Sequence, residues 1–295
     1  MKKLREIILE VGIKKIAVGH FNISNFEMLK VIVSVVMKLR APVIIGVSEG
    51  EREYLGVRRS KDLVESVRNE YGIPVYLNAD HTHSFEKCEE AAKAGFDAIL
   101  FDGSKLSFEE NIKETKKVVE MVKSINPDIL VEGELGYIGG SSAIRKEIPA
   151  GAAIKPEDLT KPEEAARFVK ETKVDLLGPA VGNIHGMFAN APEPALDIPR
   201  IKAIVEASGV PLVLHGGSGN TDSDFSAAID AGVRIVHIST EIRVAWRKAL
   251  EQSLKDNPEE IAPYKIMPPV MEAMEKVIEQ RLKLFNYGVG SSTTK

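Results

Sequence analysis

The sequence predicts a (β/α)8 TIM barrel with an additional C-terminal helix, and three observations lead to this fold class. Short apolar runs of strand type occur eight times along the chain, and most are followed by a segment of helical period. The runs are continuously apolar rather than alternating, as parallel strands covered on both faces require. Eight such units can close into a barrel, whereas an open, doubly wound sheet is the competing arrangement.

The predicted strands extend along the whole chain. In order, they are Ile16–Phe21, Pro42–Ser48, Pro74–Asp80, Phe96–Asp102, Ile129–Glu134, Val174–Val181, Pro211–His215 and Val233–Ile238. Helical period indicates helices over Phe85–Ala94, Phe108–Ser124 and Phe225–Ala231. Gly95 and Gly232 end the first and third of these helices, and Asn126-Pro127 breaks the second. The charged N-terminal segment favours a first helix over a signal peptide.

Two segments lie outside this alternation. Gly139–Lys161 is long and rich in Gly, Ser, Ala and Pro, which is typical of a mobile lid after the fifth strand. Glu272–Phe285 is amphipathic, so this C-terminal helix is expected to pack on the barrel or against another subunit. We therefore expect residues 1–287 to form one barrel domain and residues 288–295 to form a disordered tail.

Composition excludes several classes of protein. The 295 residues are 44% hydrophobic and 28% charged, which is typical of a soluble globular protein. A net charge of −4 gives no reason to expect nucleic acid, and no apolar run is long enough to span a membrane. The single cysteine, Cys88, excludes an internal disulfide framework and favours a reducing compartment. The cytoplasm is the expected location.

Histidines and carboxylates gather where the predicted strands end. In a (β/α)8 barrel these ends meet at the catalytic face. One histidine there is usually a hydrogen-bonded structural residue, but several at one mouth favour a metal site. Three neutral imidazoles with an open fourth position are typical of a catalytic zinc centre. The histidines concerned are His20, His81, His83, His185, His215 and His237.

Glycine-rich turns follow the seventh strand. The run His215-Gly216-Gly217-Ser218-Gly219 lets the backbone approach an anion closely, and Ser239-Thr240 follows the eighth strand. These glycines could simply permit tight turns. Their position beside His185 and His215 favours phosphate binding, which the loops after strands seven and eight often provide in such barrels.

At these residues the chain resembles the class II fructose-bisphosphate and tagatose-bisphosphate aldolase family. The resemblance extends from Ala17 to Phe285, and its most specific motifs occur in the family's order. They are Asn78-Ala79-Asp80-His81, Phe101-Asp102-Gly103-Ser104, Glu132-Gly133-Glu134-Leu135-Gly136, Gly182-Asn183-Ile184-His185-Gly186 and Leu214-His215-Gly216-Gly217-Ser218-Gly219.

The resemblance implies a zinc-dependent lyase of carbohydrate metabolism, in glycolysis, that reversibly cleaves a ketose bisphosphate. Fructose 1,6-bisphosphate would give dihydroxyacetone phosphate and glyceraldehyde 3-phosphate. A tagatose-bisphosphate or other sugar-phosphate aldolase is an alternative, as is a zinc-binding barrel without turnover. A Schiff-base aldolase is disfavoured because no predicted strand ends in lysine. The family also implies a homodimer or homotetramer.

The resemblance also implies roles for individual residues. Asp80 corresponds to the catalytic residue that exchanges a proton with the aldehyde oxygen. A monovalent cation, Na⁺ or K⁺, is expected near Gly186 and Gly216. The implied zinc ligands are His81, His185 and His215, with Asp102 beside the site and Glu134 at a second or displaced metal position. The implied substrate-binding residues are Asn22, Ser48, Gly186, Gly216, Ser218, His237, Ser239 and Thr240.

Several positions depart from the family pattern. The acidic loop that supplies the proton-abstracting base is replaced near Ser141-Ser142, where Glu147 could substitute but is more typical of surface charge. His237 stands where the family has asparagine, and Gly46 stands where glutamine is common. Ala189 replaces a frequent lysine, and Tyr264 lies where an arginine usually grips the distal phosphate. The substrate and the base therefore stay open at this stage.

Overall fold

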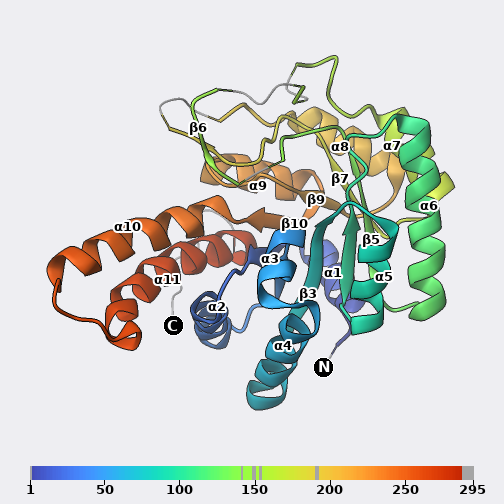
Figure 1. Cartoon of the computed structure of the whole chain (residues 1–295). Coiled ribbons are helices and arrows are strands. Elements are labelled where there is room, and N and C mark those ends of the chain that lie inside the picture. Colours follow the sequence, from blue (N-terminus) through green and yellow to red (C-terminus); the bar gives the residue numbers. More distant parts are fainter. Residues whose placement is uncertain (1, 141, 148–150, 153–154, 190–192, 288–295) are drawn as a thin grey trace.

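Eight parallel strands form a closed barrel in the computed structural model, and helices surround it (Figure 1). The structure describes residues 2–140, 142–147, 151–152, 155–189 and 193–287. All eight predicted strands are present, and the open-sheet alternative is wrong because β1 pairs with both β2 and β10. In spatial sequence, the barrel strands are β1 (Val18–Asn22), β10 (Val233–Ile238), β9 (Leu212–Leu214), β7 (Leu176–Pro179), β5 (Leu130–Leu135), β4 (Ala98–Phe101), β3 (Val75–Thr82) and β2 (Val43–Val47).

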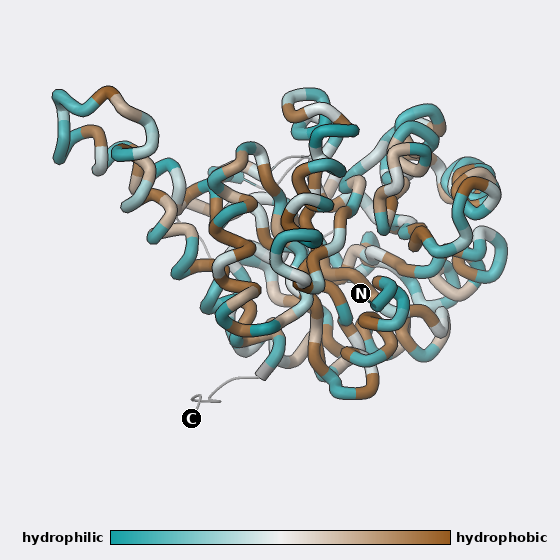
Figure 2. The backbone as a smooth tube through the Cα atoms, turned by 90° about the horizontal axis from the view of Figure 1, so that it is seen from below, coloured by the Kyte–Doolittle hydropathy of each residue, from teal (hydrophilic) through white to brown (hydrophobic). Residues whose placement is uncertain are grey.

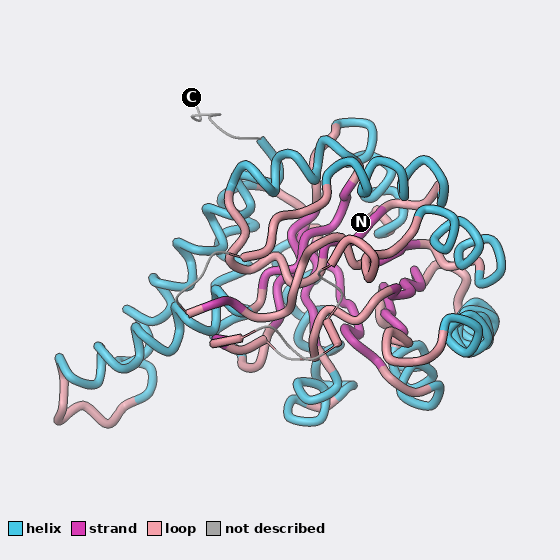
Figure 3. Tube along the Cα trace, turned by 90° about the horizontal axis from the view of Figure 1, so that it is seen from above, coloured by secondary structure: helices cyan, strands magenta, loops and turns pink. Residues whose placement is uncertain are grey.

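The helices form a ring outside the strands, as the view from above shows (Figure 3). The predicted helix over Phe85–Ala94 is confirmed without change, and the one from Phe108 ends one residue later, at Ile125. In chain order, the helices of the structure are α1 (Leu4–Lys14), α2 (Phe26–Leu39), α3 (Glu49–Leu55), α4 (Val57–Tyr71), α5 (Phe85–Ala94), α6 (Phe108–Ile125), α7 (Pro162–Thr172), α8 (Ile198–Ser208), α9 (Asp222–Ala231), α10 (Thr240–Asp256) and α11 (Pro263–Tyr287).

Two predicted helices are longer in the structure. Helix α9 begins at Asp222 instead of Phe225, because Thr221 and Asp224 form a capping box at its start. Helix α11 begins at Pro263 instead of Glu272 and contains Pro268 and Pro269. Proline removes backbone donors and normally ends a helix. Packing of α11 along α10 and α2 buries Val270 and Met274, so tertiary contacts override that local signal.

A small parallel sheet lies outside the barrel, and the sequence did not predict it. Strand β6 (Ile144–Arg145) comes from the segment predicted to be a lid, and it pairs with β8 (Met187–Phe188). The Arg145 guanidinium also donates a hydrogen bond from Nε to the carbonyl oxygen of His185, at 2.5 Å. The described part of the predicted lid therefore contacts the loop that carries His185.

The barrel interior changes from apolar to polar along its axis. At the amino ends of the strands, inward residues of all eight strands form an apolar cluster with Leu4, Ile7, Ile8 and Val11 of α1. Helix α1 thus closes the bottom of the barrel, where the view from below places the N-terminus (Figure 2). Because strand side chains alternate, residues two and four positions further on face the same interior. On β1 this series reads Val18, His20, Asn22.

The outer face of the barrel carries the main hydrophobic core. Side chains such as Phe21, Leu77 and Val131 point outward from the strands and pack against the helices. Because the apolar cluster with α1 fills the amino end of the interior, the polar inward-facing residues gather at the carboxyl ends of the strands. Within the described residues, no helix is long and apolar enough to cross a membrane.

Candidate active site

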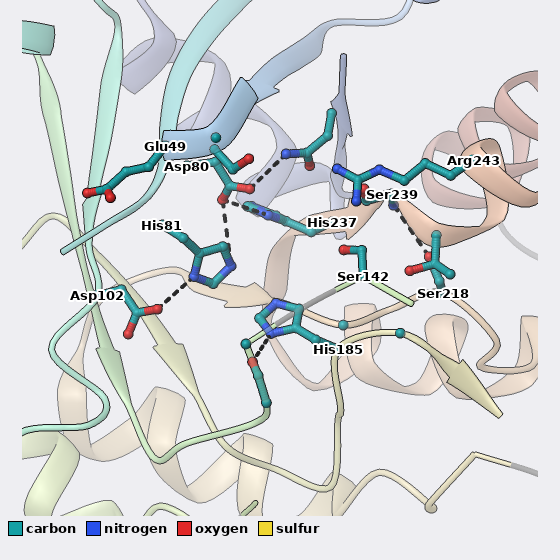
Figure 4. A pocket seen from close by; sticks show the side chains of 18 of the residues that line it. Glu49, Asp80, His81, Asp102, Ser142, His185, Ser218, His237, Ser239 and Arg243 are labelled. Atoms are coloured by element: carbon teal, nitrogen blue, oxygen red, sulfur yellow. Dashed lines mark hydrogen bonds and ion pairs between the residues drawn. The ribbon is translucent and has the colours of Figure 1, made fainter. Parts of the chain in front are cut away.

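The carboxyl ends of the barrel strands surround a cavity of about 370 Å³, a size typical of small-molecule sites. Figure 4 shows polar side chains entering it from several different strands and loops. Every residue to which the resemblance implies a catalytic, metal-binding or substrate-binding role lines this cavity except His215 and Glu134. Those two side chains are fully buried and lie against residues that line it, through the ring contact of His215 with His185 and the approach of Glu134 to His81.

Three histidines converge at the cavity floor. One potential ligand atom from each of His81, His185 and His215 lies within 4.8 Å of the other two. Their ring centroids are separated by 4.6, 4.9 and 5.9 Å, with the rings edge to face. Edge-to-face rings can direct in-plane lone pairs toward one common point. This arrangement is the one expected of a tridentate metal site.

Each of these histidines is held through one ring nitrogen. Nδ1 of His81 lies 2.9 Å from Oδ2 of Asp102, Nδ1 of His185 lies 2.6 Å from the carbonyl oxygen of Gly139, and Nε2 of His215 lies 2.6 Å from Oε1 of Glu132. The partners of His81 and His185 are acceptors, as is Glu132 when it is ionised, so the ring nitrogen that faces each of them carries the proton. The opposite nitrogen of His185 and of His215 then keeps its lone pair for a ligand, and that of His81 does so once the ring has lost its second proton, as at other histidine metal sites.

Asp80 lies between the histidines and the substrate-binding residues. Its Oδ2 accepts a hydrogen bond from Nδ2 of Asn22 at 2.9 Å. Its Oδ1 is buried without a hydrogen bond among the described residues, 3.5 Å from Nδ1 of His237 and 3.9 Å from Nε2 of His81. The next residue, His81, has φ of 39°. A non-glycine residue in this region is strained, and such strain often occurs at functional sites.

Asp102 and Glu134 both approach His81, on the side of its Nδ1. Oε2 of Glu134 lies 3.4 Å from that nitrogen and has no hydrogen-bond partner among the described residues. His81, Asp102 and Glu134 could therefore form a second ligand group, separate from the three-histidine group although they share His81. His83 is half exposed, and its Nδ1 lies 3.8 Å from Oδ2 of Asp102. It lies beside the site, outside both ligand groups.

His20 and His237 form a stacked pair deep in the barrel. Their ring centroids are 3.4 Å apart and the rings are inclined by only 4°. Although these two residues and Asp80 lie close enough to form a metal group, imidazole lone pairs lie in the ring plane. Parallel planes this far apart cannot both contain one ion about 2 Å from each nitrogen. The stack therefore orients His237 instead of forming a chelate.

The opposite side of the cavity is suited to an anion. Gly186, Gly216, Ser218, Ser239 and Thr240 line it, and the last two form the start of α10. Ser239 is the N-cap of α10, yet its side chain makes no capping bond, and its Oγ is buried without a partner among the described residues. The backbone N–H groups of Ser239 and Glu241 instead donate long hydrogen bonds, both 3.4 Å, to Oγ of Ser218. A helix N-terminus carries positive partial charge and binds anions.

Comparison with known proteins agrees with this geometry. Residues 2–288 match the family Fructose-bisphosphate aldolase class-II. The chain is 35% identical over 285 residues to a fructose-bisphosphate aldolase of Staphylococcus aureus, and the alignment covers 96% of each chain. This chain belongs to the class II fructose-bisphosphate aldolase family. It is an aldolase, and so a lyase.

Further relatives of this aldolase share its whole length. A fructose-bisphosphate aldolase of Geobacillus stearothermophilus is 34% identical over 287 residues, covering 96% of both chains. The YdjI aldolase of Escherichia coli K12 superposes with a TM-score of 0.80 at 28% identity, over 98% of this chain and 99% of that one. A putative fructose-1,6-bisphosphate aldolase of Coccidioides immitis superposes with a TM-score of 0.82 at 25% identity, over 98% and 97% of the two chains.

Family membership implies a divalent metal for this aldolase, and the residues present fit one. Nδ1 of His215 is buried without a hydrogen bond among the described residues, and Glu132 fixes the ring from the other side. Leaving a buried polar atom unpaired is costly unless a ligand satisfies it. Three neutral imidazoles with an adjacent open cavity form a borderline-soft donor set that suits zinc and related ions.

The electrostatics of the aldolase site separate the histidines into two classes. Burial lowers the pKa of His185 and of His215 to about 3, and the neighbouring His81 lowers them further. Burial also acts to lower the pKa of His81, but Asp80, Glu134 and Asp102 outweigh it and raise that pKa to about 10. Metal binding through His81 must therefore displace a proton, which makes metal affinity pH-dependent.

The carboxylates of the site also fall into two classes, one with a lowered pKa and one with a raised pKa. Burial acts to raise the pKa of Asp80, but His81 and His20 hold it below its usual value, so Asp80 is ionised. Burial raises the pKa of Glu132 and Glu134 well above normal, and Asp80 and Asp102 respectively add to the effect. Burial also lowers the pKa of His237 well below its ordinary value. The site thus holds acid and base forms side by side near neutral pH.

Four side chains in or beside the cavity of the aldolase were given no role from the sequence. Glu132 positions His215, and its spacing of two from Glu134 on one strand is a signal that both face inward. Glu51 and Arg243 pair at 2.6 Å, and Glu51 also accepts a hydrogen bond from Asn22; neither belongs to a motif quoted from the sequence. Ser142, from the loop lacking the acidic residues, lines the cavity, whereas Glu147 is exposed and does not.

Proposed function

We propose that this aldolase reversibly cleaves a ketose 1,6-bisphosphate, fructose 1,6-bisphosphate first of all, into dihydroxyacetone phosphate and glyceraldehyde 3-phosphate. The observation that carries the proposal is the three-histidine group, in which each ring has one nitrogen held by an acceptor and the other available. We assign His81, His185 and His215 as ligands of Zn²⁺. Bound there, zinc would supply a Lewis acid for the ketone oxygen of the substrate.

Asp80 is the catalytic residue of the proposal. Its ionised state and its Oδ1, which makes no hydrogen bond within the described part of the chain, suit it to take the proton of the C4 hydroxyl as the C3–C4 bond breaks, and to return that proton in the aldol direction. Asn22 holds the other oxygen of Asp80, so the carboxylate can present Oδ1 to the substrate. Asp102 orients His81, and we assign Glu134 to a second or displaced metal position.

The remaining candidate residues bind substrate. Gly186, Gly216, Ser218, Ser239 and Thr240 form the phosphate subsite, while Asn22, Ser48 and His237 contact the sugar. Gly216 has φ of 58°, and a Cβ there would lie 2.4 Å from the carbonyl oxygen of Ile184, so only glycine allows this loop to approach a ligand. A monovalent cation near Gly186 and Gly216 and a cytoplasmic, glycolytic role belong to the same proposal.

Release of triose phosphate from fructose 1,6-bisphosphate tests the proposal. We expect cleavage by the zinc-loaded protein, loss of cleavage after chelation, and recovery when zinc is added back. His185→Ala should lose bound zinc and turnover while keeping the circular dichroism of the parent, because its ring lies at the cavity and not in the core.

The choice of sugar needs a parallel assay with tagatose 1,6-bisphosphate. A faster rate with tagatose 1,6-bisphosphate would transfer the proposal to that sugar. If zinc-containing protein cleaves neither bisphosphate, both are excluded as substrates, and a different aldehyde partner or a binding role replaces the proposal. Equal turnover by chelated protein or by His185→Ala would overturn the metal assignment.

A further inference from the structure

We propose that Arg243 is a specificity-determining residue that binds the phosphate group of the substrate, and that Glu51 links this contact to Asp80. The inference rests on the proposed function, which it deepens by naming a cation for the phosphate subsite. Arg243 lies one helical turn beyond Ser239, in α10. In Figure 4 its side chain enters the cavity from the side on which Ser239 and Ser218 also lie.

The cavity has an excess of negative charge that a phosphate must overcome. Glu49, Asp80 and Asp102 line it, and Glu51 is buried next to its lining. Among the described residues that line the cavity, the only lysine or arginine side chains are Lys105 and Arg243. Lys105 follows β4 and lies 5.3 Å from the ring of Tyr137, away from α10. Arg243 is thus the cation available to the subsite at Ser239 and Thr240.

Most N–H donors of the Arg243 guanidinium make no hydrogen bond within the described residues. Its side chain is 37% exposed, and among the described residues its one hydrogen bond runs from Nη2 to Oε1 of Glu51 at 2.6 Å. Arginine carries five N–H donors in a planar fork that fits phosphate oxygens two at a time. A second feature also indicates an anion here, because the buried Oγ of Ser239 has no partner within the described part of the chain.

The buried carboxylate of Glu51 holds that guanidinium in place. It is 7% exposed, and its Oε1 also accepts a hydrogen bond from Ser24. Its Oε2 accepts bonds from Nδ2 of Asn22 at 3.0 Å and from both the backbone and the hydroxyl of Ser48. A buried carboxylate needs this full set of donors together with an opposite charge. Arg243 supplies the charge.

The same contacts continue to the catalytic carboxylate. Asn22 uses Nδ2 twice, donating to Glu51 and, at 2.9 Å, to Oδ2 of Asp80. Arg243, Glu51, Asn22 and Asp80 therefore form an unbroken series of hydrogen bonds across β1, from α10 to the end of β3. A phosphate held by Arg243 stiffens this series and keeps Asp80 in place. Glu51 is a positioning residue, because it acts through its neighbours.

Binding of inorganic phosphate to the zinc-loaded protein tests Arg243 independently of catalysis. We expect Arg243→Met to weaken phosphate binding about 10- to 100-fold, the loss that a charge-assisted bidentate contact implies. Arg243→Lys should lie between the parent and Arg243→Met, because it keeps the charge and loses the fork. The matched control is Arg247→Met, one turn further along α10, where the arginine is 68% exposed, pairs with Glu251 and lies outside the cavity.

Steady-state kinetics test the link to Asp80. We expect Arg243→Met mainly to raise KM for the bisphosphate. Glu51→Gln should mainly lower kcat, by about tenfold or more, since it loosens Asn22 and Asp80. A merely structural Glu51 would lower stability and leave kcat of the folded fraction unchanged. That result would remove the link while leaving the role of Arg243 intact.

The outcomes separate this proposal from the proposed function. Phosphate binding that is lost in Arg243→Met and kept in Arg247→Met supports the role of Arg243, even if the parent cleaves no bisphosphate. Equal phosphate affinity in the parent and Arg243→Met overturns it, as does an equal loss in both arginine variants. A parent that binds no phosphate overturns it as well.

Discussion

Gly46 lies directly beneath the ring of His20, and the absence of its side chain is what makes room for the stacked histidine pair. A Cβ at Gly46 would lie 2.1 Å from Cε1 of His20, far inside contact distance. Gly46→Ala should therefore displace His20, remove the stack from His237 and disturb Asp80. We expect a destabilisation of about 1–3 kcal/mol, the usual cost of overpacking, and about a tenfold loss of turnover. Thermal unfolding and cleavage assays measure both.

The control for this change is Gly50→Ala. Gly50 lies in α3 with no atom within 4 Å of a would-be Cβ, so alanine should leave the stability unchanged or raise it slightly. Because Gly50 lines the cavity, it is the control for stability and not for turnover. In addition, truncating the clashing ring in a Gly46→Ala/His20→Ala double variant should recover part of the lost stability. If Gly46→Ala melts with the parent and turns over normally, the stack has no role in orienting His237.

At the residue scale, the sequence predicted the individual chemical groups better than their partners. The implied histidines and Asp80 converge because all of them follow strand ends, and barrel topology brings strand ends together. Glu51 and Arg243 are 192 residues apart. No local sequence pattern relates two such residues, because their contact depends on where the packing of the barrel places α3 and α10 relative to β1. Whether each assigned residue acts as proposed stays a prediction.

Helix α10 begins at an N-cap residue whose own side chain makes no capping bond, in contrast to α2, α5 and α9. The N-cap residues Asn25, Ser84 and Thr221 accept hydrogen bonds from the first turns of their helices. Ser239 of α10 makes no such bond. We expect Ser239→Asp to stabilise the fold by about 0.3–1 kcal/mol, because a carboxylate complements the helix dipole. The same carboxylate should repel phosphate and weaken its binding at least about tenfold.

Denaturant unfolding and phosphate titration of one protein sample check both halves of that prediction. Thr221→Asp is the matched control, because it changes the N-cap of α9, which lies outside the cavity. It should leave phosphate affinity as in the parent. A stabilised Ser239→Asp that still binds phosphate like the parent would show that the α10 N-terminus takes no part in anion binding.

Elements were predicted from sequence to the extent that their signals were local. Helix α5 has both a serine cap and a terminal glycine in left-handed conformation, so its bounds could be predicted. The start of α11 could not, since Pro268 and Pro269 give a false stop that packing on α10 overrides. The two-residue strands β6 and β8 are too short for any periodicity to register.

At the scale of the whole molecule, the barrel followed from repetition and not from any single strand. Eight continuous apolar runs imply eight buried parallel strands, and closure is the arrangement that leaves none at an edge. That residues 1–287 unfold as one domain stays a prediction, and the expected tail over 288–295 lies outside the described residues. Subunit association depends on the shape of the surface, and the periodicity of strands and helices does not predict that shape.

The hairpin of α10 and α11 projects from the barrel, as the views from below and above both show (Figures 2 and 3). Its turn region exposes large apolar side chains, with Ile261 at 89% and Tyr264 at 76% exposure. Exposed apolar groups on a projecting element are typical of subunit contacts. We therefore expect a homodimer or homotetramer that uses this hairpin. Light scattering should give at least twice the 32.3 kDa of one chain.

Substituting the two apolar residues distinguishes an interface from incidental exposure. Ile261→Asp/Tyr264→Asp should weaken association at least about tenfold, because a carboxylate buried at a contact loses its hydration without gaining a partner. The melting curve of the dissociated chain should stay cooperative, since neither side chain packs in the core. Ile13→Asp is the matched control, as Ile13 is 84% exposed on α1 at the closed end of the barrel. A monomeric parent, or an association constant that Ile13→Asp lowers as much as the hairpin variant does, would remove the hairpin as the subunit contact.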